Sequence, residues 1–247
     1  MKNNSFENKG TFRPWSAESI QWYERASAYT RYHQDLSRHL LPHLRVEDRC
    51  CELACGTGSL ARMLAPHVAA YTANDIDAEA IAYNEKILRE SGGDALRSLT
   101  IVPGDWKTAL EGQQFDTVLF SFFGAVLKDW DLLRRLASRR IIAITYGGRK
   151  KQADDRKSRQ EHAEDIAGFL EEKRIPFETI FTELEFGQPL ADMEDARRYT
   201  RYYYQLDERE IDAFLAEKLI RRSDGTLYFP KKKSLGIIII RMDEKKA

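Results

Sequence analysis

The sequence predicts an α/β fold built on a mostly parallel sheet. Strand-like and helix-like segments alternate from Arg49 to Tyr146, and this alternation is typical of parallel βαβ units joined by right-handed crossovers. A glycine-containing turn follows the first strand of this region and opens a helix. The length of 247 residues suffices to bury one full hydrophobic core with a modest insertion. Because no internal repeat or long linker interrupts the chain, we predict one domain spanning residues 1–247.

A single long helix is predicted ahead of the sheet, from about Ser16 to Leu44. Apolar and aromatic side chains recur there at three- and four-residue steps, and Pro42 marks the approaching end. The apolar face carries several rings, among them those of Trp22 and Tyr29. The helix is therefore expected to bring an aromatic surface to the fold.

Five strands are predicted in the alternating region, each as a short run rich in apolar residues. They lie at Arg49–Leu53, Val68–Ile76, Leu99–Val102, Phe115–Phe120 and Ile141–Tyr146. Helical spacing of apolar residues predicts one helix directly after the glycine turn and another at Ala78–Glu90.

The last third of the chain does not follow this alternation of strands and helices. It ends in the run Ile237–Ile240, which suits a strand buried on both faces. Helices are predicted at Asp154–Lys173, Met193–Tyr204 and Glu208–Leu219, and strands at Phe177–Phe186, Gly225–Phe229 and Ser234–Met242. We interpret this part as an elaboration of the one domain.

Charge and cysteine content argue against several classes of protein. The 39 basic and 39 acidic residues balance, so the net charge does not call for a nucleic acid or an anionic membrane as partner. Cys50, Cys51 and Cys55 are crowded into one segment, which favours a reduced cytosolic setting over a disulfide framework or a structural zinc site. The polar start of the chain and the lack of an apolar run of ~20 residues predict a cytoplasmic protein without a membrane segment.

The most informative segment is Glu52–Gly58, in which Gly56 and Gly58 stand between a strand and a helix. Glycine lets the backbone approach a ligand closely, and the start of the helix presents unpaired N–H groups. Asp75 ends the next strand about twenty residues on, where a carboxylate can bind the hydroxyls of a nucleoside ribose. Each residue taken singly could be an ordinary turn or cap residue. Together, at the ends of successive strands, they predict a nucleoside site.

In these segments the chain resembles the class I, Rossmann-like family of S-adenosylmethionine-dependent methyltransferases. Glu52–Gly58 is similar to the family's first motif, an acidic residue followed by Gly-x-Gly-x-Gly, with Ala54 in place of the first glycine. Gly104–Trp106 is similar to the segment that holds adenine, with Asp105 accepting from the amine and Trp106 against the ring. The resemblance covers about residues 47–148 and implies S-adenosylmethionine as cofactor. The cofactor-binding residues that it implies are Glu52, Ala54, Cys55, Gly56, Gly58, Asp75, Ile76, Asp105, Trp106 and Ser121.

The same resemblance implies a more detailed architecture. It implies a seven-stranded, mostly parallel sheet with helices on both faces, an antiparallel final strand, an N-terminal lid helix and a helical C-terminal elaboration. Within the one domain we expect a leader and lid helix at 1–46 and a cofactor-binding core at 47–148. The C-terminal part at 149–247 is expected to hold the substrate-side elaboration and the final strands.

The methyl acceptor is predicted to be a small molecule that is methylated on an O, N, S or C atom. Family members that methylate nucleobase or glutamine amines carry an Asn/Asp-Pro-Pro-Tyr/Phe tetrapeptide, but here Ser121–Gly124 occupies its position. Acidic residues that would bind magnesium directly after the fourth strand are absent too, so no metal is predicted. No catalytic residue is singled out, because each of the five histidines suits a surface or packing role. The candidate substrate residues are Tyr29, Tyr32, Phe123, Tyr146 and Arg201.

Three alternative functions stay open. An NAD-dependent oxidoreductase would share the glycine turn and the ribose acid, but Ser59 stands where the dinucleotide fingerprint needs its third glycine. An RNA- or protein-directed methyltransferase could use the basic and tyrosine-rich segments, although the balanced charge argues against it. A non-catalytic binding protein could keep the same fold. The oligomeric state is not predicted.

Overall fold

The computed structural model describes residues 14–91, 96–148 and 161–242. The chain divides into two compact units, which we call the smaller and the larger unit. The smaller unit comprises Met1–Tyr32 and Glu185–Lys232, and the larger unit comprises His33–Leu184 and Lys233–Ala247. The sequence-based boundaries at residues 46 and 148 stay a prediction.

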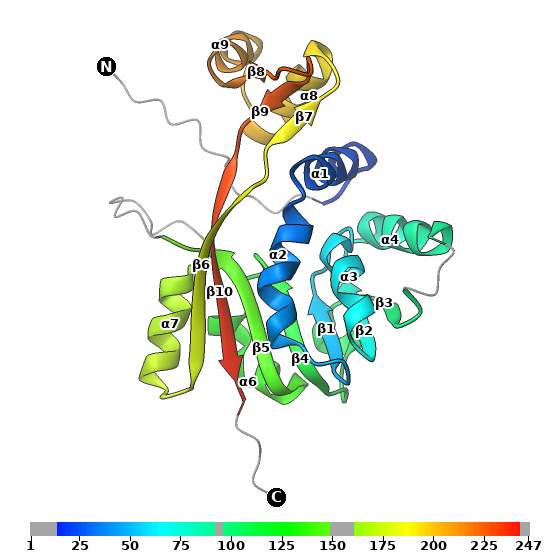
Figure 1. The fold of residues 1–247 in the computed structure, drawn as a ribbon, viewed down its shortest axis with the longest axis vertical. Coiled ribbons are helices and arrows are strands. Elements are labelled where there is room, and N and C mark those ends of the chain that lie inside the picture. Colours follow the sequence, from blue (N-terminus) through cyan, green and yellow to red (C-terminus); the bar gives the residue numbers. More distant parts are fainter. Residues whose placement is uncertain (1–13, 92–95, 149–160, 243–247) are drawn as a thin grey trace, which may run out of the picture. The chain divides into compact units, whose positions relative to one another are not determined.

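The larger unit contains a seven-stranded sheet in the order β3-β2-β1-β4-β5-β10-β6 (Figure 1). Strands β1 to β5 pair in parallel wherever they are neighbours, and the final strand β10 runs antiparallel to β5. The predicted mostly parallel, seven-stranded sheet with an antiparallel final strand is therefore confirmed. The strands are β1 Arg49–Leu53, β2 Ala70–Asp75, β3 Leu99–Pro103, β4 Phe115–Ser121, β5 Ala137–Tyr146, β6 Phe177–Glu185 and β10 Lys232–Arg241.

Helices cover both faces of this sheet, as the α/β pattern predicts. In Figure 1, α2, α3 and α4 lie on the face turned to the viewer, while α6 and α7 lie behind. The helices are α2 Tyr32–Leu40, α3 Ser59–Leu64, α4 Ala78–Glu90, α5 Trp106–Ala109, α6 Val126–Leu136 and α7 Ala163–Glu172, with single 3₁₀ turns at Leu41–His43 and Ala65–His67. The helix predicted at 154–173 thus lies at 163–172, and its first residues fall outside the described part of the chain.

One hydrophobic cluster of the larger unit lies between the sheet and helices α6 and α7. Side chains of the central strands, such as Val118, Phe120 and Ile141, pack there against Leu133 and Ile166. The run Ile237–Ile240 is buried throughout, with at most 1% of each residue exposed, so the predicted doubly buried strand is confirmed. This packed scaffold holds the carboxyl ends of β1 to β5 along one edge.

The prediction of a single long helix from Ser16 to Leu44 is wrong, because this segment forms two separate helices. Helix α1, Ala17–Thr30, ends at Arg31, whose φ of 58° is left-handed, and α2 begins directly after it. A left-handed residue cannot continue a right-handed helix. Apolar spacing runs unbroken across the break, so periodicity alone did not reveal it. The role of this segment as a lid stays a prediction.

The smaller unit contains a three-stranded sheet in the order β7-β9-β8, together with α1 and two further helices. Its remaining elements are β7 Gln188–Leu190, α8 Met193–Tyr204, α9 Glu208–Lys218, β8 Ile220–Arg221 and β9 Leu227–Phe229. Aromatic rings fill its interior: Trp22 lies edge-on to Tyr199, and Tyr199 stacks on Phe229. The helical C-terminal elaboration is therefore confirmed, with aromatic packing at its centre.

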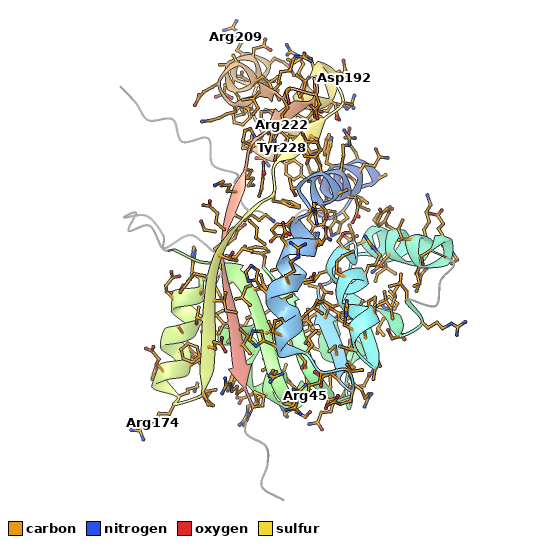
Figure 2. All side chains as sticks on the ribbon, in the orientation of Figure 1. Arg45, Arg174, Asp192, Arg209, Arg222 and Tyr228 are labelled. Atoms are coloured by element: carbon orange, nitrogen blue, oxygen red, sulfur yellow. The ribbon has the colours of Figure 1, made fainter. Side chains whose placement is uncertain are left out.

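A second aromatic contact in the smaller unit is built around Tyr228, which is fully buried. The guanidinium carbon of Arg222 lies 3.9 Å from the centre of the Tyr228 ring, and Figure 2 shows the two residues beside one another. Both also donate to the carboxylate of Glu185. A Cβ added at Gly187 would lie 2.1 Å from the Tyr228 hydroxyl oxygen, so only glycine fits there.

The buried carboxylate of Asp195 joins α1 to α8 within the smaller unit. It accepts hydrogen bonds from Trp22 Nε1 at 2.8 Å, Arg25 at 2.6 Å and the Ala191 N–H at 3.0 Å. Burial works against ionisation, but these donors outweigh it and lower the pKa of Asp195. Because a carboxyl with a depressed pKa stabilises the fold only while ionised, this contribution is lost as the pH falls through that pKa.

Replacing Asp195 with alanine is expected to destabilise the protein by roughly 1 to 3 kcal/mol, since the buried Trp22 N–H loses its acceptor. Urea unfolding followed by tryptophan fluorescence measures the change. A matched control is Asp212→Ala, which removes the exposed partner of Arg197 and is expected to cost less than about 1 kcal/mol. Equal effects of the two substitutions would contradict the role assigned to Asp195.

Candidate functional site

The glycine turn after β1 has the backbone conformation of a ligand-binding turn. Ala54, Gly56 and Gly58 all have positive φ, at 52°, 55° and 72°. The turn is held in place by two backbone hydrogen bonds, from Cys55 N to Asn74 O and from Gly58 N to Cys55 O, both 3.0 Å. Ala54 stands where the family motif has glycine, and it keeps the left-handed conformation at a cost of about 1–2 kcal/mol. The alanine therefore leaves the turn in place.

The carboxylate of Asp75, at the end of β2, is buried and lies against this turn. Its Oδ2 accepts from Gly56 N at 2.6 Å, and its Oδ1 accepts from Asp77 N at 2.9 Å. A carboxylate offers about four acceptor sites, so each oxygen can accept a further hydrogen bond from a hydroxyl. The structure thus brings the predicted ribose acid and the predicted turn into direct contact.

Glu52 lies beneath the turn and is 3% exposed. Its carboxyl accepts a hydrogen bond of 2.9 Å from the buried hydroxyl of Tyr71 on β2. Burial raises the pKa of Glu52 to about 8, although the hydrogen bond from Tyr71 opposes the shift. At neutral pH the side chain is therefore mainly a neutral acid, which supports the turn from inside the fold. Its direct contact with a cofactor stays a prediction.

Gly58 begins helix α3 and is covered by the side chain of Asn84 from α4. A Cβ added at position 58 would lie 2.2 Å from Asn84 Nδ2 and 2.4 Å from its Oδ1. Asn84 is 1% exposed and its Nδ2 lies 3.9 Å from the sulfur of Cys55. Sequence reasoning missed Asn84, because no sequence motif marks a polar helix residue that packs against a glycine turn.

The expected adenine segment follows β3 at the same edge of the sheet. Asp105 is exposed and caps α5 by accepting from Lys107 N at 3.0 Å, and Ile76 beyond β2 is 66% exposed. Trp106 is 7% exposed and packs in the core, so little of its surface is open to a ligand. The roles of these three residues toward adenine stay predictions.

The turn after β4 carries strain and an unpaired polar atom. Phe122 has a φ of 54°, a conformation that costs an aromatic residue energy and that recurs at ligand sites. Its N–H donates to Ile144 O at 2.7 Å, which fixes the turn to β5. The preceding Ser121 Oγ is enclosed without a hydrogen-bond partner. Phe123, the residue predicted to contact substrate, is 37% exposed, while its neighbour Phe122 points toward β5.

Aromatic and basic side chains meet at the carboxyl end of β5. The Phe122 and Tyr146 ring centres are 4.7 Å apart, and those of Tyr146 and His162 are 6.2 Å apart. The ammonium of Lys233, from β10, lies 4.8 Å from the centre of the Phe122 ring. Burial raises the pKa of Tyr146, so its hydroxyl stays neutral. Among these four residues, only Tyr146 was predicted from the sequence to contact substrate.

A groove of about 480 Å³ opens directly beyond this group in the larger unit. It is lined by residues of β6, β10 and the end of β5, among them Phe181, Leu235 and Gly147. Leu235 pairs with Tyr146 in the β10–β5 ladder, so the groove adjoins the aromatic group. The volume lies in the range of small-molecule sites, about 300–1,000 Å³.

Three of the predicted substrate residues belong to the smaller unit. The ring of Tyr29 is 5.3 Å from that of Tyr228, and Tyr32, 2% exposed, is 4.7 Å from the ring of Phe186. The guanidinium of Arg201 is paired with Glu208, so its charge is already balanced. The substrate role of these three residues stays a prediction.

The described residues contain neither a metal-binding cluster nor a membrane-spanning helix. Among residues 14–91, 96–148 and 161–242, no group of three or more His, Cys, Asp or Glu side chains could hold a metal ion. No helix in this described part of the chain has the length and apolar character needed to cross a bilayer. The expectation of a metal-free site stays a prediction.

Comparisons with known proteins agree with this geometry. A family model described as a methyltransferase domain matches residues 51–140, which contain the glycine turn, Asp75 and the turn after β4. A search of curated proteins found no match.

Solved structures with the same fold cover most of the chain. The YcgJ protein from Bacillus subtilis matches with a TM-score of 0.57 and 16% identity, over 85% of this chain and 99% of that one. Magnesium protoporphyrin IX methyltransferase from Synechocystis PCC 6803, solved with bound SAH, has a TM-score of 0.54 and 13% identity, over 91% and 95%. A putative sarcosine dimethylglycine methyltransferase from Galdieria sulphuraria has a TM-score of 0.53 and 15% identity, over 94% and 92%.

The strand order and the glycine turn joined to the acid of β2 agree with the matching domain model. Residues 51–140 therefore match a methyltransferase domain within a Rossmann-like methyltransferase fold, which is consistent with the class I family of S-adenosylmethionine-dependent methyltransferases.

Proposed function

We propose that the protein binds S-adenosylmethionine along the carboxyl ends of β1 to β4 and transfers its methyl group to a small-molecule acceptor. The observation that carries this proposal is the contact between Asp75 and the turn, with Asp75 Oδ2 2.6 Å from Gly56 N. The contact places a buried carboxylate beside a turn with positive φ at three positions. This combination suits a nucleoside ligand.

The residues present fit the cofactor. Within the turn at Ala54–Gly58, Gly56 has no side chain that would keep a ligand from the backbone, and Asp75 keeps acceptor capacity for ribose hydroxyls. Asp105 and Ile76 are exposed beside it, where an adenine ring could lie. The bound cofactor supplies a methyl group on a sulfonium sulfur.

The contribution of the chain itself is alignment and exclusion of water. Methyl transfer is an in-line displacement, so the acceptor atom must be held close to the methyl carbon and away from solvent. Phe122 and Tyr146, both half-buried at the ends of β4 and β5, provide an apolar surface for this purpose. The adjoining groove of about 480 Å³ supports a small molecule as acceptor.

The test of the cofactor site is a substitution at Asp75. Asp75→Ala is expected to weaken S-adenosylmethionine binding by roughly 1 to 3 kcal/mol, because a charged hydrogen-bond acceptor is lost. Isothermal titration calorimetry measures the affinity, and thermal unfolding confirms that the variant is folded. The matched control is Asp77→Ala, which removes the neighbouring carboxylate that caps α4 through Ala80 N at 3.0 Å and is expected to keep the affinity.

Two outcomes of this titration would overturn the proposal. One is equal affinity in the wild type and a folded Asp75→Ala variant. The other is binding of NAD by the wild type with no binding of S-adenosylmethionine, which would favour an oxidoreductase. Salt-sensitive binding of RNA at moderate ionic strength would instead move the acceptor from small molecules to nucleic acid.

A further inference from the structure

Two polar atoms at the carboxyl ends of β4 and β5 are enclosed but have no hydrogen-bond partner: Ser121 Oγ and His162 Nδ1. Buried polar groups almost always find a partner, so each exception needs an explanation. Ser121 pairs with Ile144 in the β4–β5 ladder, and Tyr146, two residues further, forms a bridge with His162. The two unpaired atoms therefore lie on neighbouring segments of one sheet edge.

The half-buried rings of Phe122 and Tyr146 belong to these same segments. Their centres are 4.7 Å apart with planes inclined at 50°, and the His162 ring lies 6.2 Å beyond Tyr146. Ring surfaces of this kind bind planar apolar groups by offset or edge-on contact. Polar atoms without partners beside an aromatic surface suit a ring that carries a hydrogen-bonding substituent.

One cation lies beside this surface. The Lys233 ammonium lies 4.8 Å from the Phe122 ring centre. Carboxylates lie nearby and keep their negative charge: Glu161 accepts from Val126 N and Leu127 N, and Asp165 accepts from His162 N. Glu164 accepts from the N–H of Gly148. The Lys233 ammonium, held against the Phe122 ring, would stabilise negative charge on an acceptor oxygen that lies on the same ring.

The other histidines are less suited to take a proton at this edge. His33 is 6% exposed, and burial together with the charges of Lys233 and Arg62 lowers its pKa to about 3. His39 faces Thr182 on β6, while His43 and His67 lie in the 3₁₀ turns that precede β1 and β2. His162 alone among the five pairs with the end of β5.

We infer that the acceptor is an aromatic hydroxyl compound, held against Phe122 and Tyr146 beside Lys233, and that His162 accepts the proton of its hydroxyl group. This inference rests on the proposed function. The acceptor oxygen gives its proton to His162 Nδ1 and forms a bond to the methyl carbon. The carbon–sulfur bond breaks with its electron pair leaving on sulfur. The positive charge of the sulfonium thus ends on the imidazolium, which releases the proton to solvent.

The test compares two phenols with the full-length protein. In mildly alkaline buffer phenol is still protonated and needs a base, whereas 4-nitrophenol is mostly ionised and does not. His162→Gln is expected to reduce methyl transfer to phenol by roughly 100-fold or more, the usual contribution of a general base, and transfer to 4-nitrophenol by only a few-fold. The matched control is His67→Gln, an exposed histidine of the same unit, which is expected to leave both rates unchanged.

A second measurement does not depend on turnover. The absorbance of 4-nitrophenol reports whether the bound molecule is ionised, and wild-type protein is expected to hold it as the phenolate below the pH at which it ionises in solution. His162→Gln is expected to lose this shift and keep the affinity. Tyr146→Leu is expected to weaken the affinity for both phenols.

Equal loss of rate for both phenols in His162→Gln would overturn the base, and failure of the wild type to bind 4-nitrophenol would overturn the aromatic acceptor. Titration of the wild type with S-adenosylmethionine separates these results from a failure of the proposed function. Binding of the cofactor without binding of either phenol would contradict this inference and leave the proposed function standing. Absence of cofactor binding would contradict both the proposed function and this inference.

Discussion

A valine at position 58 is expected to abolish S-adenosylmethionine binding and to destabilise the protein by more than about 3 kcal/mol. Gly58 has a φ of 72°, and its missing Cβ would lie 2.2 Å from Asn84 Nδ2. The strain of a left-handed backbone and the overlap with a buried side chain therefore both contribute to the loss of stability. Isothermal titration and urea unfolding measure the two effects.

Two further variants separate strain from overlap. Gly112 has a similar φ of 74° with nothing within 4 Å of its added Cβ, so Gly112→Ala is expected to cost only about 1–2 kcal/mol and to keep the cofactor affinity. In an Asn84→Ala background, Gly58→Ala is expected to cost no more than this control. A Gly58→Ala penalty that is the same with and without Asn84 would show that the overlap has no energetic weight.

The second large effect concerns the pH dependence of stability. The pKa of Glu52 is raised to about 8 in the folded protein by burial, well above its ordinary value near 4.5. Between these two values the folded state holds a proton that the unfolded state has released, so the free energy of unfolding falls as the pH rises through this window. The neutral acid thus stabilises the fold at low pH, and this contribution is lost as the pH passes about 8.

Glu52→Gln is expected to remove this dependence, because an amide oxygen can still accept the hydrogen bond from Tyr71 and carries no charge. At pH 9 the variant should be more stable than the wild type by several kcal/mol, up to about 5, while the two should be similar at pH 4. Urea unfolding at a series of pH values measures the difference. Glu79→Gln, at an exposed position of α4, is the matched control. Wild type and Glu52→Gln curves that stay parallel across the series would contradict the assigned burial.

Much of the larger unit could be predicted from the sequence, because local pattern and final environment agree there. Strand β1 and helix α4 lie at the predicted residues, and Ile237–Ile240 is buried as its unbroken β-branched run indicates. Helix α6 was not predicted, although its buried side chains Val126 and Leu133 lie seven residues apart on one face. Asp129, with a φ of −118°, interrupts the helical backbone there.

Only those parts of the candidate site that lie at the ends of consecutive strands could be predicted from the sequence. The glycine turn and Asp75 each end a strand, so their contact follows from parallel pairing of β1 and β2. Phe122, Lys233 and His162 come from three distant segments, and their meeting at one edge depends on the antiparallel docking of β10 and on the bridge to Tyr146. The left-handed φ of Phe122 has no sequence signature, because aromatic residues rarely adopt it.

The way the chain divides between its two units has an evolutionary consequence. The smaller unit consists of the segment before His33 and the insertion from Glu185 to Lys232, and the insertion leaves from β6 and returns into β10, which are neighbours in one sheet. Recombination at these three junctions would exchange the entire aromatic unit without cutting any crossover among β1 to β5. The smaller unit could therefore change as a whole while the strands β1 to β5 of the larger unit stay intact.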